Sequence, residues 1–187
     1  MKSIRRKGFT LVELLIVIVV IGILSAMMML SSTEAVSSAR ASNVVSNLRN
    51  IKTAVLSWYA DNLNRVVKDG SEYKIYTKDS TTEKNILITF VKDKGGESEL
   101  LAYLSNGSSI SFKDKSSAAV GEYILTEQDN SSGGRSWYVG LRVGTDKNLQ
   151  SKVASKASSV GLTGGGKTDV TNTYTGGEYV YMLIHSL

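Results

Sequence analysis

Residues 9–30 read FTLVELLIVIVVIGILSAMMML, an apolar run whose single charged side chain is Glu13. A helix rises about 1.5 Å per residue, so this run forms a helix of about 33 Å, long enough to cross the hydrocarbon core of a bilayer. The preceding residues, MKSIRRKG (1–8), are basic and contain no acidic side chain. Basic residues before an apolar helix keep the N-terminus in the cytoplasm. We therefore expect a membrane anchor, with the rest of the chain outside the cytoplasm.

Three kinds of N-terminal segment agree with such a run to different degrees. One is a secretory signal peptide, but the run is long for one, and Ser25–Ala26 is a poor cleavage site. An uncleaved signal anchor agrees with both the length and the charge. Neither explains Glu13, because a carboxylate inside a membrane helix is costly and by default indicates a function with a partner. The third kind is therefore a membrane anchor in which Glu13 is functional and interacts with a partner group.

The composition removes several classes of site. The chain contains no cysteine, which excludes disulfides, thiolate zinc sites, cysteine nucleophiles and lipid attachment at a cysteine. Its single histidine, His185, leaves no basis for a histidine-based metal cluster or a catalytic triad, and we expect it to be a surface residue. We therefore predict that the chain is not an enzyme, and we expect no cofactor.

The formal net charge of +5, from 22 basic and 17 acidic residues, would suggest an acidic partner such as nucleic acid. Four of the basic residues, Lys2, Arg5, Arg6 and Lys7, lie ahead of the apolar run. Without them the basic and acidic residues nearly balance. The basicity therefore belongs to the N-terminal segment, and we expect no specific nucleic-acid partner.

The residues around the start of the apolar run resemble the prepilin motif of type IV pilins and pseudopilins. Lys7-Gly8-Phe9-Thr10-Leu11-Val12-Glu13-Leu14 contains the basic residue, the glycine, the aromatic residue and the T-L-V-E-L sequence of that motif. A continuous apolar helix follows, and the resemblance extends through it toward residue 60. It implies that a prepilin peptidase removes residues 1–8 as a leader, cutting between Gly8 and Phe9, and that the new amine of Phe9 is methylated.

The resemblance also implies a function, a set of partners and a location. The chain is expected to be a structural subunit of a type IV pilus, assembled with other copies into a helical filament through its N-terminal helix. Its other partners would be the prepilin peptidase, the pilus assembly platform with its ATPase, and the cytoplasmic membrane. We expect it in that membrane, with its N-terminus inside, before assembly, and in an extracellular pilus afterwards.

Two other functions stay open. A type II secretion pseudopilin has the same N-terminus but builds a periplasmic piston, and the sequence separates the two poorly. A signal-anchored surface binding domain would keep residues 1–8. The sequence after the anchor resembles no particular pilin, so a role in adhesion, motility or DNA uptake cannot be read from it.

Cleavage at Gly8 would create an ammonium group at Phe9, about one helical turn from Glu13. We expect the Glu13 carboxylate of one subunit to meet the Phe9 ammonium of its neighbour in a salt bridge that sets the register between subunits. An ion pair between Glu13 and the N-terminus of its own chain is the alternative, and the spacing permits it.

Helical spacing continues beyond the apolar run. One apolar stripe recurs at helical intervals, and the chain contains no proline to interrupt it. We predict one helix from about Phe9 to Asp61 and divide the chain into a leader (1–8), a membrane and filament-core helix (9–33) and a globular head (34–187). Many pilins bend at a proline near the end of the apolar run, where this chain has Leu30 and Ser31. The stripe consists of Val44, Leu48, Ile51, Val55 and Trp58.

After Asp61 the pattern changes to short β-branched and aromatic segments separated by Gly, Ser, Asn and Asp, which indicates antiparallel strands. The expected fold class is therefore α+β, a long helix packed on an antiparallel sheet. Residues 97–104 and 146–160 are predicted helices, the second capped by Thr145 and ended by Gly161. The predicted strands are EYKIYT (72–77), NILITFV (85–91), SISF (109–112), EYILT (122–126), RSWYVGLRV (135–143) and EYVYMLI (178–184).

Residues 161–168, GLTGGGKT, match the nucleotide-binding pattern G-x-x-x-x-G-K-[ST] at every fixed position. A phosphate-binding loop must follow a strand and open a helix, so that backbone N–H groups face the phosphates. Here a predicted helix precedes the pattern and a strand-like segment follows it. We therefore predict a flexible surface loop without nucleotide, in which Lys167 has no essential role.

Asp169, Asn172 and Glu178 are weak candidates for a calcium site near the C-terminus, like that of some pseudopilins. Calcium needs six to eight oxygen ligands, and this spacing matches no known calcium loop. We therefore expect plain solvated turn residues and no metal.

Overall fold

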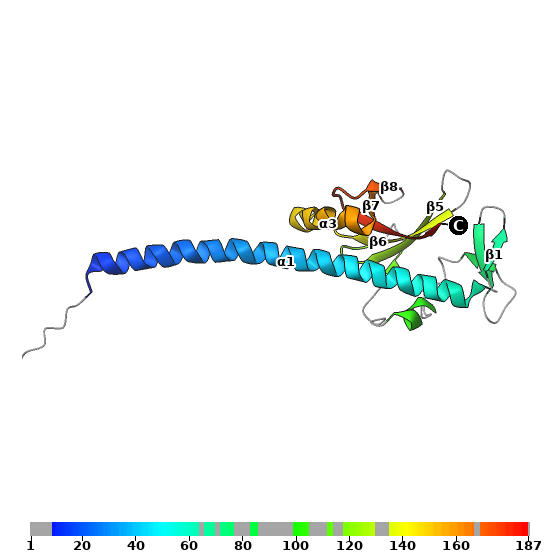
Figure 1. Ribbon diagram of the computed structural model, residues 1–187, viewed down its shortest axis with the longest axis horizontal. Coiled ribbons are helices and arrows are strands. Elements are labelled where there is room, and N and C mark those ends of the chain that lie inside the picture. Colours follow the sequence, from blue (N-terminus) through cyan, green and yellow to red (C-terminus); the bar gives the residue numbers. More distant parts are fainter. Residues whose placement is uncertain are drawn as a thin grey trace, which may run out of the picture. The chain divides into compact units, whose positions relative to one another are not determined.

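The computed structural model describes residues 9–63, 66–69, 72–76, 83–85, 99–104, 112–113, 118–129, 135–166 and 169–186. The chain divides into two compact units, Met1–Ser37 and Ser38–Leu187, which we call the anchor unit and the head. Helix α1, Leu11–Asp61, begins in the first and ends in the second (Figure 1).

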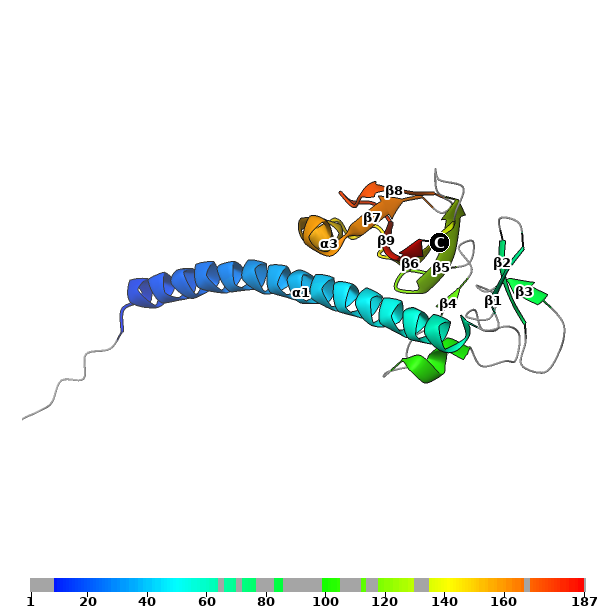
Figure 2. The ribbon, with the colours of Figure 1, turned by 45° about the vertical axis from the view of Figure 1, so that its right-hand side comes forward.

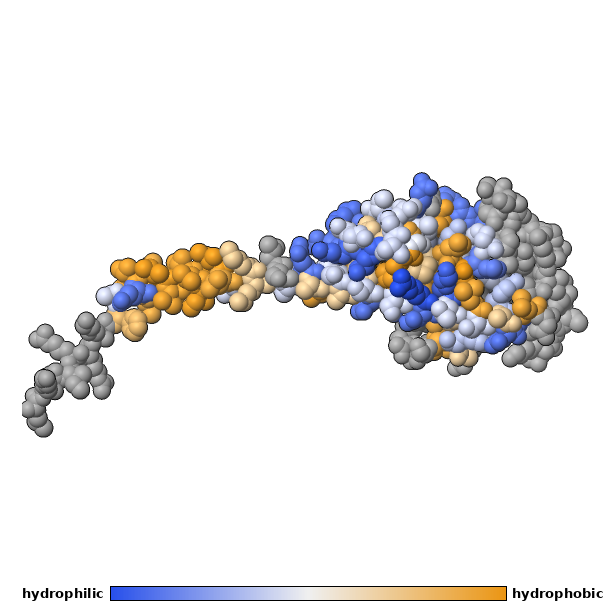
Figure 3. All heavy atoms as spheres, in the orientation of Figure 1, coloured by the Kyte–Doolittle hydropathy of each residue, from blue (hydrophilic) through white to orange (hydrophobic). Residues whose placement is uncertain are grey.

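In the anchor unit, α1 is apolar on nearly all sides over residues 14–29. The large side chains of its first turns are exposed, and the helix is long and apolar enough to cross a membrane. Figure 3 shows a mostly apolar surface over these turns, with a hydrophilic patch near the start of the helix. The backbone stays helical at Leu30 and Ser31, so the helix is continuous at the position where many pilins carry a proline. The prediction of one helix to Asp61 is confirmed.

The head contains a six-stranded sheet in the order β4-β5-β6-β9-β7-β8. Five of these strands pair antiparallel, which confirms the α+β class, whereas β4 pairs parallel with β5. The parallel pair corrects the all-antiparallel expectation. The strands are β4 (Phe112–Lys113), β5 (Tyr123–Asp129), β6 (Arg135–Arg142), β7 (Leu162–Gly165), β8 (Val170–Thr173) and β9 (Tyr179–Ser186).

A second, three-stranded antiparallel sheet has the order β1-β2-β3. Strand β2 was expected, whereas β1 was not. Residues 86–91 of the expected strand 85–91 lie outside the described residues. The same holds for residues 109–111 of the expected strand 109–112. The remaining elements are β1 (Val66–Asp69), β2 (Glu72–Tyr76), β3 (Glu83–Asn85), the 3₁₀ helix η2 (Glu99–Tyr103) and α3 (Lys147–Val160). Residues 99–103 were expected to be helical, and the tighter 3₁₀ form is what short helical segments often adopt.

The core of the head lies between the six-stranded sheet and the two helices. Figures 1 and 2 show α1 passing across one face of the sheet, with α3 beside β7. Strand β9 illustrates the alternation: Val180 and Met182 join the helices, while Tyr181 joins a smaller cluster on the opposite face. The predicted stripe on α1 is buried along its whole length, from Val44 to Trp58, and Trp58 is only 1% exposed.

Helix α3 begins one residue later than expected. Its cap is Asp146, whose carboxylate accepts the backbone N–H groups of Asn148 and Leu149 at 3.0 and 3.1 Å. The prediction of Thr145 is therefore wrong, because the carboxylate one position later reaches the free N–H groups of the first turn. Gly161 ends the helix as expected, with φ +69° and its N–H donating to the Ala157 carbonyl.

Candidate functional site

The first turn of α1 is held by hydrogen bonds between Thr10 and Glu13. The Glu13 Oε2 atom accepts from the Thr10 backbone N–H at 2.8 Å and from the Thr10 hydroxyl at 2.9 Å, and the Glu13 N–H donates to the Thr10 Oγ1 at 3.2 Å. This reciprocal pattern is a capping box, in which a threonine and a glutamate three residues later satisfy N–H groups that a helix start leaves free. The sequence T-x-x-E predicts it, and our reading of Glu13 as a partner of the Phe9 amine overlooked it.

The capping box leaves part of the Glu13 carboxylate available. Both bonds from Thr10 end on Oε2, and no described residue bonds Oε1. The side chains around it are exposed, including Phe9, which is 87% exposed. Gly8 lies outside the described residues, so the predicted cleavage bond stays a prediction. The geometry thus presents a helix start with one bonded and one open carboxylate oxygen.

The three calcium candidates do not form a ligand set. The Glu178 Oε2 atom accepts from Arg142 Nη2 at 3.1 Å and from Arg142 Nε at 3.3 Å, so its charge is already paired. Asn172 lies on β8, which β7 separates from β9. Strands two apart in a sheet are about 9–10 Å apart, so Asn172 does not lie on a strand next to β9. Among the described residues, no group of three or more His, Asp or Glu side chains could hold a metal ion.

The segment that matches the nucleotide pattern is a strand where it is described. Residues 162–165 form β7, which lies between β9 and β8, so the expectation of a flexible loop is wrong. Gly161 is the α3 cap, and Gly165, with φ +156°, approaches the Asp169 carbonyl so closely that a Cβ would lie 1.9 Å from it. These glycines therefore have structural reasons, while Lys167 and Thr168 lie outside the described residues. Helix α3 precedes this segment and strand β8 is the next described element after it, whereas a phosphate-binding loop follows a strand and opens a helix.

Among the titratable groups that the structure describes in the head, none is an activated nucleophile. Burial raises the pKa of Tyr174 and of Tyr181 to about 12, and burial also raises that of Tyr123 although a hydrogen bond from Asn47 opposes the shift. These phenols therefore stay neutral at physiological pH. His185 is half-buried on β9, and its ring lies 5.8 Å from that of Tyr59, so it packs against α1 and is not a plain surface residue.

Comparison with known proteins finds a match for the N-terminal segment of the chain. Residues 4–29 match the family model described as the prokaryotic N-terminal methylation motif. The match includes Gly8, Phe9 and Glu13 and confirms the resemblance seen in residues 7–14. No curated protein and no solved structure matches the chain significantly.

Proposed function

We propose that this chain, which carries the leader motif of type IV prepilins and pseudopilins, is a structural subunit of a type IV pilus. The observation that carries the proposal is the methylation motif at the start of a helix that continues without interruption into the packed helix of a head. Such a chain has one end suited to an apolar environment and another suited to water. A filament built from it keeps the first ends inside and the heads outside.

The exposed apolar surface of the anchor unit supports this assignment. Side chains such as Leu15, Ile18 and Ile21 are about half exposed, and a helix that is apolar on all sides needs an apolar surrounding. The bilayer supplies this apolar surrounding before assembly, and the N-terminal helices of other subunits supply it in the filament. Subunits repeated by a rotation that does not close build an open helical polymer.

Glu13 has a defined place in the proposed assembly. Cleavage between Gly8 and Phe9 by a prepilin peptidase creates an ammonium group at Phe9. The open Oε1 atom of Glu13 can accept a hydrogen bond from the Phe9 ammonium group of a neighbouring subunit. The capping box fixes the carboxylate at the start of α1 while Oε2 is engaged. The pairing neutralises two charges in an apolar filament core and sets the register of one subunit on the next. A separate platform and its ATPase supply the work of extraction from the cytoplasmic membrane.

The N-terminus of the mature chain tests the proposal. Intact mass and N-terminal sequencing of the protein from its native membrane should show a chain that begins at Phe9 with one methyl group on its amine. A mature protein that begins at Met1 would mean an uncleaved anchored domain, and one that begins after Ala26 would mean a signal peptide. Either result contradicts the assignment.

Electron microscopy separates a pilus from a pseudopilin, since both share the leader. Extracellular filaments should disappear in a strain that lacks only this gene and return when the gene is restored. A strain that keeps its filaments and loses secretion of a periplasmic substrate would identify a pseudopilin instead.

A further inference from the structure

The positive charge of the chain after residue 8 is concentrated on its two packed helices. Of the 22 basic and 17 acidic residues, four basic ones lie in residues 1–8, so the remaining chain carries a net charge of +1. Between Glu34 and Asp61, α1 has three basic residues and no acidic one. Residues 146–160, which form α3 and its cap, have three basic residues and one acidic one. These two stretches together carry +5, so the rest of the chain after residue 8 carries −4.

Helix α3 is basic and hydrophilic on the side that faces away from the core of the head. Its buried residues are Gln150, Val153 and Ala157, and no residue from Lys147 to Val160 is acidic. At 100° per residue, Lys152 lies about 200° around the helix from Gln150, so it points away from the core. Small residues next to it let a flat surface come close to the helix. The exposed residues of α3 are Lys147, Asn148, Ser151, Ser155, Ser158 and Ser159.

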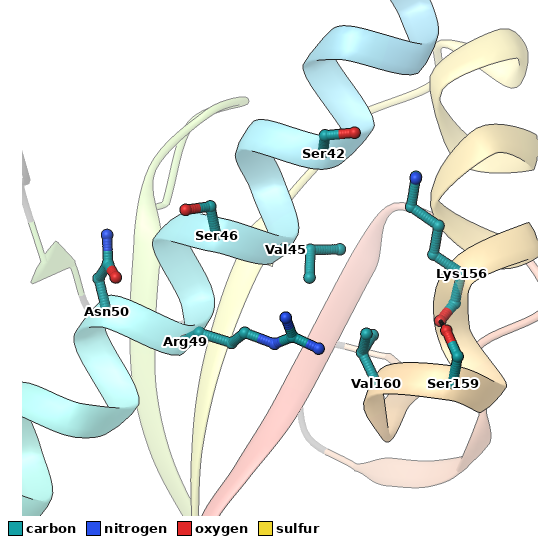
Figure 4. A pocket seen from close by; sticks show the side chains of 8 residues that line it. All are labelled: Ser42, Val45, Ser46, Arg49, Asn50, Lys156, Ser159 and Val160. Carbon is teal, nitrogen blue, oxygen red and sulfur yellow. Dashed lines mark hydrogen bonds between the residues drawn. The ribbon is translucent and has the colours of Figure 1, made fainter.

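The ammonium groups of α3 form no ion pair with any residue that the structure describes. The Lys147 Nζ atom donates to the uncharged Gln150 Oε1 atom at 3.3 Å. The carboxylate of Asp146 accepts the free N–H groups of the first turn through its Oδ1 atom. Figure 4 shows the Lys156 ammonium and the Arg49 guanidinium at different ends of the cleft between α1 and α3. The cations are therefore spread over a surface and not gathered around one small ligand, which suits an extended anionic partner.

The chain tethers this surface to its own membrane anchor. Ala41, the first buried residue of α1 in the head, follows Leu30, the last residue of the apolar run, by eleven residues. Eleven residues span at most about 40 Å in any conformation. Helix α3 lies beside this first part of the head, since Lys156 lines the same cleft as Ser42 and Val45. A short tether raises the effective concentration of lipid headgroups around the head to roughly the millimolar range, so a weak attraction between charges is enough for binding.

We propose that the outer face of α3 docks on the anionic lipid headgroups of the membrane that the anchor unit spans. Lys147, Lys152 and Lys156 supply the attraction, and each cation held near an anionic lipid surface favours docking about five-fold. The buried side of α3 packs in the head, so the contact is electrostatic and the helix does not insert. Docking holds the head at the membrane before the subunit is extracted. It requires the anchor but no filament, so it does not depend on the pilus assignment.

Fluorescence quenching on the full chain in lipid vesicles tests the docking. The chain has no cysteine, so Ser155→Cys allows a single label on the exposed side of α3, and Ser57→Cys allows the same label on an exposed position of α1. Vesicles of phosphatidylcholine alone are compared with vesicles that also contain phosphatidylglycerol, both with a quencher on the headgroups. Quenching at position 155 should be stronger in the anionic vesicles and should fall in 1 M salt, where the screening length is about 3 Å. Quenching at position 57 should change much less.

Changing all three lysines of α3 to glutamine should lower the ratio of docked to free heads about a hundred-fold, at about five-fold for each cation. Changing the same three lysines to arginine is the matched control, and it should leave the ratio within about two-fold because the charge is kept. Equal quenching at position 155 in both kinds of vesicle, or an equal loss in both variants, would overturn the proposal. Binding of a DNA duplex without any response to phosphatidylglycerol would overturn it in favour of a nucleic acid. A chain that does not float with the vesicles would overturn it too, because the tether would then be missing.

Discussion

At Glu13 one carboxylate serves the start of a helix and, in the proposed filament, a neighbouring chain. The two tasks use different oxygen atoms, since Oε2 accepts both bonds from Thr10. A substitution that removes the whole side chain therefore cannot separate them. Glutamine can, because it also forms a capping box but carries no charge.

Glu13→Gln should lower incorporation into filaments about as strongly as Glu13→Ala does, by ten-fold or more, while membrane insertion and leader cleavage continue. Immunoblots of sheared filaments and of membranes, normalised to total protein, measure both quantities. Incorporation of Glu13→Gln at the wild-type level, with a loss only in Glu13→Ala, would show that the capping box is the part that matters. The charge would then be dispensable.

Gly140 is required by a contact and not by its backbone conformation. It lies opposite Tyr181 across the β6–β9 pair, and a Cβ at this position would lie 2.5 Å from two ring carbons. The ring cannot move away easily, because Tyr181 is buried and its hydroxyl donates to the Gly166 carbonyl at 2.8 Å. The glycine therefore makes room for the tyrosine.

Gly140→Ala should lower the free energy of unfolding by about 1–3 kcal/mol, the usual cost of overpacking. Gly164→Ala is the control, since its Cβ would meet only ordinary contacts, at 3.5 Å from Tyr174. Chemical denaturation of the full chain in neutral micelles, followed by tryptophan fluorescence, compares the two. Equal stability of both variants would mean that the Tyr181 ring moves without cost.

Helix α1 carries two different surfaces in its two units. Its first turns, in the anchor unit, are largely apolar and exposed, whereas its turns in the head bury one stripe against the sheet. A hydrogen bond of 2.8 Å from Asn47 Nδ2 to the Tyr123 hydroxyl ties the second part to β5. The helix is thus long and apolar enough to cross a membrane at one end, and it is a core element of the head at the other.

Trp58→Ala should lower the free energy of unfolding by about 3–5 kcal/mol, because it removes a large, fully buried side chain from this stripe. Alanine favours a helix, so the loss would come from packing and not from the helix itself. The neighbouring exposed residue is the control, and Ser57→Ala should change stability by less than about 0.5 kcal/mol. Denaturation followed by circular dichroism decides. A Trp58→Ala chain as stable as its parent would mean that the stripe contributes little to the head.

The head as a whole should lose stability in alkali. Burial raises the pKa of Tyr174 and Tyr181 to about 12, while an unfolded tyrosine titrates near 10. The folded state therefore holds its phenol protons more tightly than the unfolded state does. This contribution to stability is complete below pH 10 and is lost as the pH rises toward 12.

Denaturation midpoints measured at intervals from pH 9 to pH 12 should therefore be level at first and then fall. Tyr181→Phe, which cannot ionise, should show a shallower fall from a somewhat lower starting value, because the bond to Gly166 is also lost. A fall of the same slope in both proteins would mean that other groups cause it.

The N-terminal third of the structure follows closely from local sequence. The apolar run, the T-x-x-E cap, the absence of proline and the stripe ending at Trp58 all act through neighbours three or four residues away on one helix, so their consequences can be read in order along the chain. The motif of residues 7–14 is local in the same sense, and the candidate site at Glu13 was predicted from it. The cap of α3 shows the limit of local sequence. Thr145 and Asp146 are adjacent residues that can both cap a helix, and helix boundaries are uncertain by a residue or two.

The head depended on contacts between segments far apart in sequence. Residues 162–165 contain glycines that have little strand preference, and they become β7 because β9 and β8 offer backbone partners on both sides. Phe112 on β4 pairs parallel with Tyr123 on β5, and no local sequence pattern specifies this pairing. Arg49 and Lys156 lie on different helices, and only the packing of α1 and α3 on one face of the sheet brings them to the same cleft. Local spacing sets helices and their faces, whereas the pairing of strands and the meeting of side chains from separate elements depend on the free energy of burying the whole core at once.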